Sequence, residues 1–333
     1  MFFILLPLVF TACSIIDDDL TLCGEELVVN YQMQLQTQLS LQLQAELSAE
    51  KDSFVRHSLD RWLAPIMTDQ AEDVDLRFYA GDNDELQHQI KEVVNANRTS
   101  YTIKLPKENY MHLAIANIAS NRQVQISGEK HSETLNLSLG NNQTINTLPT
   151  GVFTARLPMV VDDTTKLFEV KLYMVTSAVA IVIDTTSCTD LRIVSGYMAG
   201  AANAFSIKDS IFRYDKPCRF ITEQVPITAS HDNVAARSGA KSTVVSQPYT
   251  CHATVCMPTE DNRPWEVVMT ANLTENRHTT TTLTIKEPLR AGTVRVIKCN
   301  MDSNGKIVPE QDSEVGASVE LDWNEGSGHD IEL

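Results

Sequence analysis

The sequence predicts a mainly β protein with two domains in tandem, a small β-sandwich that contains one helix and a second domain that is all β. Three observations lead to this prediction. Apolar and polar residues alternate with a period of two over many short segments, as they do in half-buried strands. Gly, Asn, Asp and Pro separate these segments at short intervals. The chain has 333 residues, which is enough for two domains of ordinary size, each with its own core.

The first residues are typical of a processing signal rather than of the fold. Apolar side chains run from Phe2 to Phe10, about half of the ~20 residues that a membrane-spanning helix needs. Thr11 and Ala12 then lead to Cys13, an order that resembles the bacterial lipoprotein signal. We therefore expect a signal peptide over residues 1–12, cleavage between Ala12 and Cys13, and lipid attachment at Cys13. The alternative is a buried N-terminal strand.

Lipid on Cys13 would also determine where the protein works. Each buried methylene contributes ~0.8 kcal/mol, so several acyl chains on one cysteine would hold the chain firmly in a bilayer. Residues 13–24, which carry acid at 17–19, would form a tether. The acidic run resembles the export tag of surface lipoproteins in some Gram-negative groups. We therefore expect a protein anchored in the cell outer membrane and exposed on the cell surface.

The composition excludes some functions and leaves others open. The formal net charge is −16, which argues against a nucleic-acid partner because little in the chain would neutralise phosphates. Aromatic residues make up 6% of the chain, so few rings are available for a glycan-binding platform. Apart from Cys13, six cysteines remain, and their pairing is left open because six can pair in about fifteen ways.

The first domain, residues 25–162, is expected to consist of strands and a helix. From Tyr31, apolar residues alternate with glutamines, which predicts a long first strand over 27–45 with one apolar and one amide face. The period changes at 48–64, where Val55, Leu59 and Leu63 share one helical stripe, so a helix is predicted there. A second, short helix is expected around 84–94. Further strands are expected at 74–79, 101–105, 110–118, 123–127 and 134–139.

The second domain, residues 163–333, is expected to be all β. Turn residues and charge fill 141–168, which favours a domain boundary at about 160–168. The apolar stretch 170–183 predicts one central strand. Asn304-Gly305 indicates a hairpin. The other strands are expected at 190–195, 203–214, 219–228, 243–256, 265–273, 278–286, 292–299 and 315–323, with 329–333 closing the chain.

No motif points to catalysis. The sequence lacks HExxH, GxSxG, a phosphate-binding glycine loop and a CxxC pair, so we expect no enzyme activity, no cofactor, no metal and no small-molecule substrate. The stretch from Asn300 to Gln311 is near a calcium-loop pattern, but its first and last ligands differ and a strand precedes it, so a hairpin turn is favoured. Cys251 and Cys256 lie five apart, on opposite sides of a strand, which favours packing or disulfide roles over zinc.

Three short segments resemble the O-glycosylation signal of exported proteins in some Gram-negative anaerobes. In this signal an Asp precedes the modified Ser or Thr, and a residue such as Ile or Thr follows it. The candidate sites are Thr164, Thr185 and Ser210.

Several motifs together resemble one known family, the FimB-type anchor and minor-subunit lipoproteins of type V fimbriae. The resemblance begins with a lipid cysteine followed by an alternating strand and spans nearly the whole mature chain in the same order. The motifs that carry it are DDLTLC at 18–23, NYMHLAIAN at 109–117, VKLYMV at 170–175 running on to Ile183-Asp184, AFSIKDS at 204–210, TVCMP at 254–258 and VELDW at 319–323.

The resemblance implies two transthyretin-like β-sandwich domains and no catalysis. It implies a fibre base held in the outer membrane by lipid, with other fimbrial subunits as partners. Subunits of such fibres join by strand exchange, in which an extended segment of one completes a sheet of another. We expect the exchanged edge to involve the first strand (27–45) or the C-terminal strand (315–333).

Three other functions stay open. Some relatives in such fimbriae are stalk or tip adhesin subunits. A surface glycan-binding lipoprotein would need an exposed aromatic platform, for which only Trp62, Trp265 and Trp323 are available as tryptophans, and their patterns favour core packing. A surface hydrolase would need acid, base or nucleophile groups that converge in one cleft.

Overall fold

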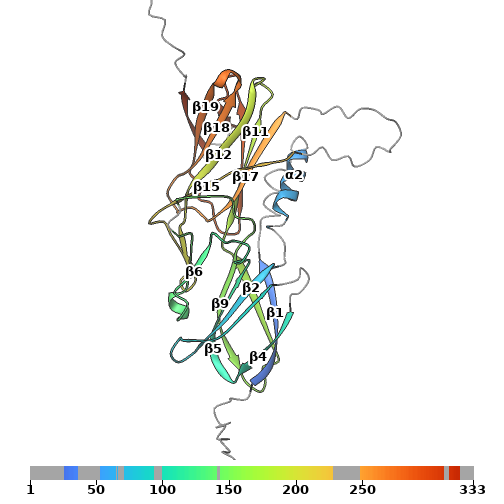
Figure 1. Ribbon diagram of the computed structural model, residues 1–333, viewed down its shortest axis with the longest axis vertical. Coiled ribbons are helices and arrows are strands. Elements are labelled where there is room, and N and C mark those ends of the chain that lie inside the picture. Colours follow the sequence, from blue (N-terminus) through green and yellow to red (C-terminus); the bar gives the residue numbers. More distant parts are fainter. Residues whose placement is uncertain are drawn as a thin grey trace, which may run out of the picture.

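The computed structural model describes residues 26–36, 53–64, 66, 71–93, 100–140, 143–227, 248–310 and 315–322. These residues form a mainly β protein with four sheets, and they contain one α-helix, α2. The molecule is elongated, with a seven-stranded sheet towards one end and the five- and six-stranded sheets towards the other (Figure 1). The prediction of a mainly β chain is confirmed, and a helix lies within the predicted range 48–64.

The seven-stranded sheet contains the first strand of the described chain in its interior. In spatial order its strands are β3 (Leu86–Val93), β2 (Asp73–Ala80), β5 (Glu108–Ala116), β9 (Phe153–Val161), β10 (Leu167–Met174), β1 (Glu26–Gln36) and β4 (Ser100–Pro106). β1 pairs in parallel with β10 and antiparallel with β4, so strands cover both of its edges.

Alternation along β1 confirms the period-two pattern. Its apolar residues Val29, Tyr31, Met33 and Leu35 are buried, whereas Gln34 and Gln36 are exposed. The amide face of the strand therefore lies at the surface, as predicted. The remainder of the predicted first strand, 37–45, lies outside the described residues.

The seven-stranded sheet folds over so that its two parts face each other. β9 pairs with β5 along its whole length and β10 pairs with β1, but β9 and β10 pair with each other only at Thr154–Tyr173 and Phe153–Met174. Across the interior, the Tyr31 hydroxyl on β1 lies 2.8 Å from Nε2 of His112 on β5. The Nδ1–H of His112 donates to the Arg77 carbonyl at 3.0 Å, so Nε2 is the nitrogen that accepts from Tyr31.

The predicted second helix at 84–94 is wrong, because these residues form β3. Leu86, His88 and Ile90 are half-buried and alternate with exposed Gln87, Gln89 and Lys91, as they do in an edge strand. β3 pairs antiparallel with β2, and these backbone hydrogen bonds outweigh the local preference of Glu, Gln and Lys for helix.

The predicted central strand at 170–183 is two strands in two different sheets. β10 belongs to the seven-stranded sheet, whereas β11 (Ser177–Asp184) lies at the centre of the five-stranded sheet and is almost wholly buried. The chain therefore passes from one sheet to the other between Met174 and Ser177. The domain boundary between residues 162 and 163 stays a prediction.

The second end of the molecule is made of two sheets. The five-stranded sheet has the order β16 (Glu223–Val225), β17 (Tyr249–Cys256), β11, β20 (Val294–Met301) and β21 (Ile307–Pro309). The six-stranded sheet has the order β22 (Val315–Asp322), β19 (His278–Ile285), β18 (Trp265–Leu273), β12 (Leu191–Ala201), β15 (Cys218–Ile221) and β8 (Thr144–Ile145). The Ile307 N–H donates to Thr281 Oγ1 at 3.1 Å, which links the two sheets directly.

The helix α2 (Ser53–Leu63) lies against β16, at the side of the five-stranded sheet (Figure 1). Val55, Leu59 and Leu63 are buried, which confirms the predicted apolar stripe. The helix was expected in the first domain, and this assignment stays a prediction. Among the described residues, α2 contacts β16, a strand from the second half.

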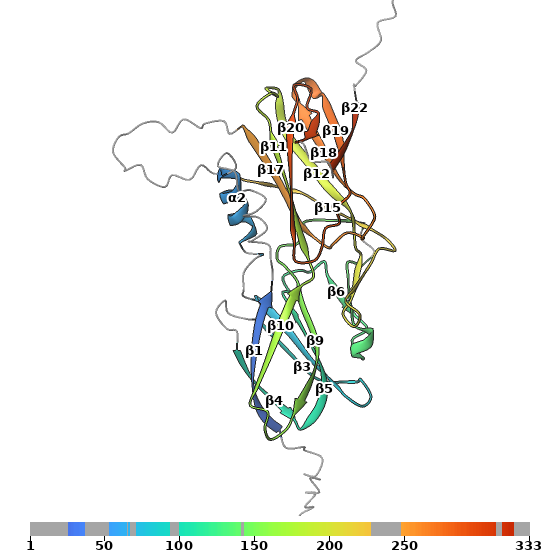
Figure 2. The ribbon, with the colours of Figure 1, turned by 180° about the vertical axis from the view of Figure 1, so that it is seen from behind.

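A four-stranded sheet joins segments that are far apart in the sequence. Its order is β14 (Ile211–Arg213), β13 (Ala204–Ser206), β7 (Asn136–Ser138) and β6 (Gln125–Ser127). Figure 2 shows β6 beside the middle of the molecule. β7 pairs with β13, and β8 pairs with β15, so residues 125–145 contribute strands to sheets shared with the second half.

Candidate functional site

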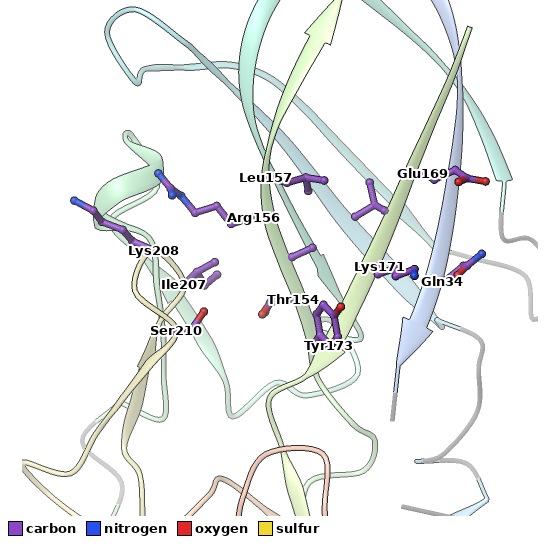
Figure 3. Close-up of a pocket in the computed structure, with 12 residues that line it drawn as sticks. Gln34, Thr154, Arg156, Leu157, Glu169, Lys171, Tyr173, Ile207, Lys208 and Ser210 are labelled. Carbon is purple, nitrogen blue, oxygen red and sulfur yellow. The ribbon is translucent and has the colours of Figure 1, made fainter. Parts of the chain in front are cut away.

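A groove lies on the open side of the seven-stranded sheet, where β9 and β10 separate. Its volume is about 650 Å³. Thr154 and Tyr173 mark the point at which the two strands part (Figure 3). The lining residues come from β1, β9, β10 and the turn after β13, and they are Gln34, Thr154, Ala155, Arg156, Leu157, Glu169, Val170, Lys171, Tyr173, Ile207, Lys208 and Ser210.

The edge of β10 that borders this groove has free backbone groups. The Val175 N–H donates to the Val152 carbonyl at 2.8 Å on the β9 side, and the Asn30 N–H donates to the Lys166 carbonyl at 3.0 Å on the β1 side. Because backbone groups point to alternate sides along a strand, Leu167, Glu169 and Lys171 direct their N–H and C=O groups into the groove. Within the described chain no strand pairs with this edge between Leu167 and Leu172.

Positive charge gathers around the groove although the whole chain is acidic. Arg156, Lys171 and Lys208 line it together with a single carboxylate, Glu169. Arg156 Nη2 donates to Ser132 Oγ at 3.2 Å, and Lys208 forms an ion pair with Glu133 at 3.0 Å. No acidic side chain in the described ranges forms an ion pair with Lys171. Figure 3 shows Lys171 on the β10 side of the groove, with Arg156 and Lys208 on the other side.

The floor of the groove is apolar. Ala155 and Val170 are buried, whereas Leu157 is only partly buried although it faces the interior of the sheet. On the outer face of β10, Leu167 is 54% exposed and Tyr173 is 61% exposed. Large exposed apolar side chains beside a free strand edge are typical of interaction surfaces.

A second free edge belongs to β22, the last strand of the described chain. β22 pairs antiparallel with β19 over its full length, from Val315 with Ile285 to Asp322 with His278. It is the outer strand of the six-stranded sheet, and no described strand pairs with its other edge.

Two of the three candidate glycosylation sites are exposed. Thr164 lies at the tip of the β9–β10 turn, where its Oγ1 donates to Asp162 Oδ1 at 2.6 Å. Ser210 lies in the turn after β13, beside the groove, with a φ of 54°. Thr185 is half-buried and its hydroxyl donates to the Pro248 carbonyl at 2.9 Å. Modification at all three sites stays a prediction.

The predicted lipid site lies outside the described residues, together with the signal peptide and tether that contain Ala12 and Cys13. Among the residues that the structure does describe, no helix is both long and apolar enough to cross a bilayer.

The two segments considered for metal binding have structural roles. Asn300 and Met301 end β20, and a turn at Asp302–Lys306 leads to β21, which confirms the hairpin; Gly305 has a φ of 78° there. Cys251 pairs with Val182 and Cys256 pairs with Ser177 on the neighbouring strand β11. Because the two cysteines are five positions apart in β17, their side chains lie on opposite faces of the sheet.

The five described cysteines are free, buried thiols. They are Cys188, Cys218, Cys251, Cys256 and Cys299. Burial raises the pKa of the Cys251 and Cys256 thiols well above the usual range, and that of Cys299 to about 12. A thiol that stays protonated is a poor nucleophile and a poor metal ligand.

The groove was missed at the sequence level, although two signals were present. Pro158 interrupts the hydrogen-bonding capacity of β9, which is typical of an edge strand. Glu169 and Lys171 flank Val170 at the beginning of the stretch that was interpreted as one central strand. Charged residues that alternate with apolar ones indicate a strand with one face at the surface.

Free strand edges and an open groove define a β protein whose surfaces suit contact with other polypeptides. The chain belongs to the family of fimbrillin-A associated anchor proteins Mfa1 and Mfa2, whose family model matches residues 64–325. The family resemblance inferred from the sequence is therefore confirmed. Fimbrial anchor proteins are not enzymes, and the family associates this chain with fimbriae and their subunits at the cell surface.

Solved structures show a similar fold at low sequence identity. A candidate adhesin from Bacteroides thetaiotaomicron has a TM-score of 0.53 and 10% identity, covering 88% of this chain and 98% of its own. A candidate adhesin from Bacteroides ovatus has a TM-score of 0.51 and 9% identity, covering 90% and 97%. The fimbrial anchor protein Mfa2 from Porphyromonas gingivalis has 12% identity and a TM-score of 0.46, covering 89% and 99%. No curated protein matches the sequence.

Proposed function

We propose that this protein holds the base of a fimbria at the cell surface. Lipid on Cys13 anchors it in the outer membrane, residues 13–24 form the tether, and the body joins other fimbrial subunits by β-strand exchange. The fold assignment that accompanies this function is two transthyretin-like β-sandwich domains in tandem. The family supplies the fimbrial context, and the sequence of residues 1–19 supplies the reason for a lipid anchor.

The observation that carries strand exchange is the free edge of β22. A strand that is paired on one side only can accept another strand on its free side. It can also leave its sheet by breaking one row of backbone hydrogen bonds instead of two. β1 is less suited to exchange, because removing it would break its pairing with both β10 and β4. Of the two edges expected from the sequence, the C-terminal one is therefore favoured.

A stalk or tip adhesin is the second candidate, because solved structures of similar fold are described as candidate adhesins. The two roles differ in position along the fibre. Antibody labelling of intact fibres would place an anchor at the membrane end and an adhesin at the shaft or the free end.

Cys13→Ala is expected to release fimbriae from cells, because it removes the thiol that carries the lipid. Cells with this variant should shed fibres into the medium or assemble fibres of altered length, measured by immunopurification and electron microscopy. Metabolic labelling with an alkynyl fatty acid should mark the wild-type protein and not the variant. Cys23→Ala is the matched control, since it removes another N-terminal thiol and should leave labelling and attachment unchanged. Unchanged attachment and length in Cys13→Ala cells would exclude the anchor role.

The glycosylation sites are a smaller part of the proposal. Thr164 and Ser210 are favoured over Thr185 because their side chains are exposed. An intact mass equal to that of the polypeptide plus lipid would exclude modification at all three.

A further inference from the structure

We propose that the free edge of β10 is a docking site for an extended, acidic segment of a neighbouring fimbrial subunit. The segment adds to the seven-stranded sheet as a strand beside β10 and lies in the groove between β10 and β9. The inference rests on the proposed function, to which it adds an acceptor edge and the chemistry of the partner.

The backbone of β10 provides the first argument. Leu167, Glu169 and Lys171 present N–H and C=O groups to the groove, as derived above from the hydrogen bonds of Val175 and Asn30. A ligand that satisfies a row of donors and acceptors at this spacing is another extended polypeptide. A glycan or a small anion would leave most of them to water.

The opposite wall of the groove is less suited to accept a strand. On β9 the groove-facing backbone positions are Arg156, Pro158 and Val160, because the Val152 carbonyl points to the same side. Pro158 has no N–H to donate, and the Val160 carbonyl already accepts the Thr165 hydroxyl at 3.1 Å. A strand would therefore pair with β10 rather than with β9.

Charge around the groove provides the second argument. Three cations and one carboxylate line it in a chain whose net charge is −16. Lys171 is next to the free edge and has no acidic partner within the described part of the chain. An incoming strand that carries carboxylates would be attracted by Lys171, Arg156 and Lys208.

The side chains of the groove specify the pattern of the incoming strand. Residues that point inward meet the apolar floor at Ala155, Leu157 and Val170, and the residues between them point outward beside Lys171. The partner should therefore alternate small or apolar residues with polar or acidic ones.

The C-terminal segment of this chain has that pattern. In residues 315–322, Val, Ala, Val and Leu alternate with Gly, Ser, Glu and Asp, and residues 307–333 contain no Lys or Arg. A neighbouring subunit with a comparable terminal strand fits the groove in both shape and charge. A synthetic peptide of residues 313–323 (SEVGASVELDW) is therefore a suitable probe.

The test is titration of the purified protein (residues 14–333) with this peptide. Isothermal calorimetry measures the affinity, and amide hydrogen exchange locates the binding site. We expect saturable binding that weakens as the salt concentration rises, and slower exchange of the Glu169 and Lys171 amides in the wild type. Glu169→Pro removes one edge donor and should weaken binding about tenfold or more. Glu169→Ala is the matched control, because it removes the same carboxylate and keeps the N–H, and its affinity should equal or exceed that of the wild type.

Charge reversal provides a second pair of variants. Lys171→Glu should weaken peptide binding about tenfold at low salt, whereas Lys104→Glu makes the same charge change on exposed β4 and should have little effect. Absence of binding, equal affinity of Glu169→Pro and Glu169→Ala, or protection confined to the β22 edge would each overturn the proposal. These measurements use isolated protein, so they can fail while Cys13→Ala cells still shed fibres.

Discussion

Replacing Arg77 with methionine is expected to lower the free energy of unfolding by about 3–5 kcal/mol. Arg77 is completely buried on β2, and its Nε and Nη2 bind both carboxylate oxygens of Asp75, at 3.1 and 2.8 Å. Asp75 is only 2% exposed. Without the guanidinium, this buried carboxylate would keep Gln89 at 2.8 Å as a donor and the exposed Lys91 at 3.8 Å, which do not compensate for its lost hydration.

Arg77 also holds the loop after β6 against β2. Its Nη2 forms an ion pair with Glu129 at 2.8 Å, and the Tyr79 hydroxyl donates to the Glu129 carbonyl at 3.1 Å. In Arg77→Met, the amides of this loop should therefore exchange faster. Urea unfolding at neutral pH gives the stability change, and hydrogen exchange gives the local one.

Two further variants test the cause of the loss. Glu129→Gln should cost less than about 1 kcal/mol, because the Glu129 side chain is half-exposed. Arg77→Met combined with Asp75→Leu should recover much of the stability, since it removes both buried charges. A double variant as unstable as Arg77→Met alone would show that packing, rather than the orphaned carboxylate, is responsible.

Acidification is expected to destabilise the protein strongly below about pH 6.5, because two histidines are buried in the neutral form. Burial lowers the pKa of His112 to about 3 and that of His252 to about 4. As the pH falls from the unfolded pKa of ~6.5 to the folded pKa, each histidine should lower the free energy of unfolding by about 1.4 kcal/mol per pH unit. Above that range neither state binds the proton, so stability should be flat; below the folded pKa both states bind it, and the effect ends.

The two histidines differ in their surroundings, which allows a control. Both nitrogens of His112 are hydrogen-bonded, whereas neither nitrogen of His252 has a partner among the described residues. His252→Leu should therefore stabilise the protein at pH 7 by about 1–3 kcal/mol and halve the slope between pH 6.5 and 4. Urea titrations at pH 7.5, 6.0 and 5.0 measure both quantities. An unchanged slope in His252→Leu would contradict this assignment.

Strand positions were largely predictable because alternation is local. β18 and β19 bury every second residue, β1 does so from Val29 onward, and this pattern is visible in the sequence. β3 was mistaken for a helix because Glu, Gln and Lys favour helix locally, and only pairing with β2 makes the segment a strand. The division of 170–183 was missed because no Gly or Pro separates β10 from β11 at Val175-Thr176.

The groove depends on pairings that no local pattern contains. If the pairing of Thr154 with Tyr173 continued along both strands, β9 and β10 would form an ordinary hairpin that ends at the 162–165 turn. The hairpin opens because β5 pairs with β9 while β1 pairs with β10, in the two facing parts of the sheet. Residues 125–145 also contribute strands to sheets shared with the second half, and these pairings are equally non-local. Lipid attachment at Cys13 stays a prediction from the sequence, because Cys13 lies outside the described residues.

The position of β1 determines how the molecule would bear mechanical load. β1 lies towards one end of the long axis, and β22 lies towards the opposite end (Figure 2). In the proposed anchor role, a pull between the membrane tether and the fibre would draw β1 along its own length, while its hydrogen bonds to β10 and β4 run across that direction. The backbone hydrogen bonds on both sides of β1 would then be loaded in shear and share the force, instead of breaking one at a time. Fluid drag on an attached fibre would thus meet one of the most resistant geometries that a sheet offers.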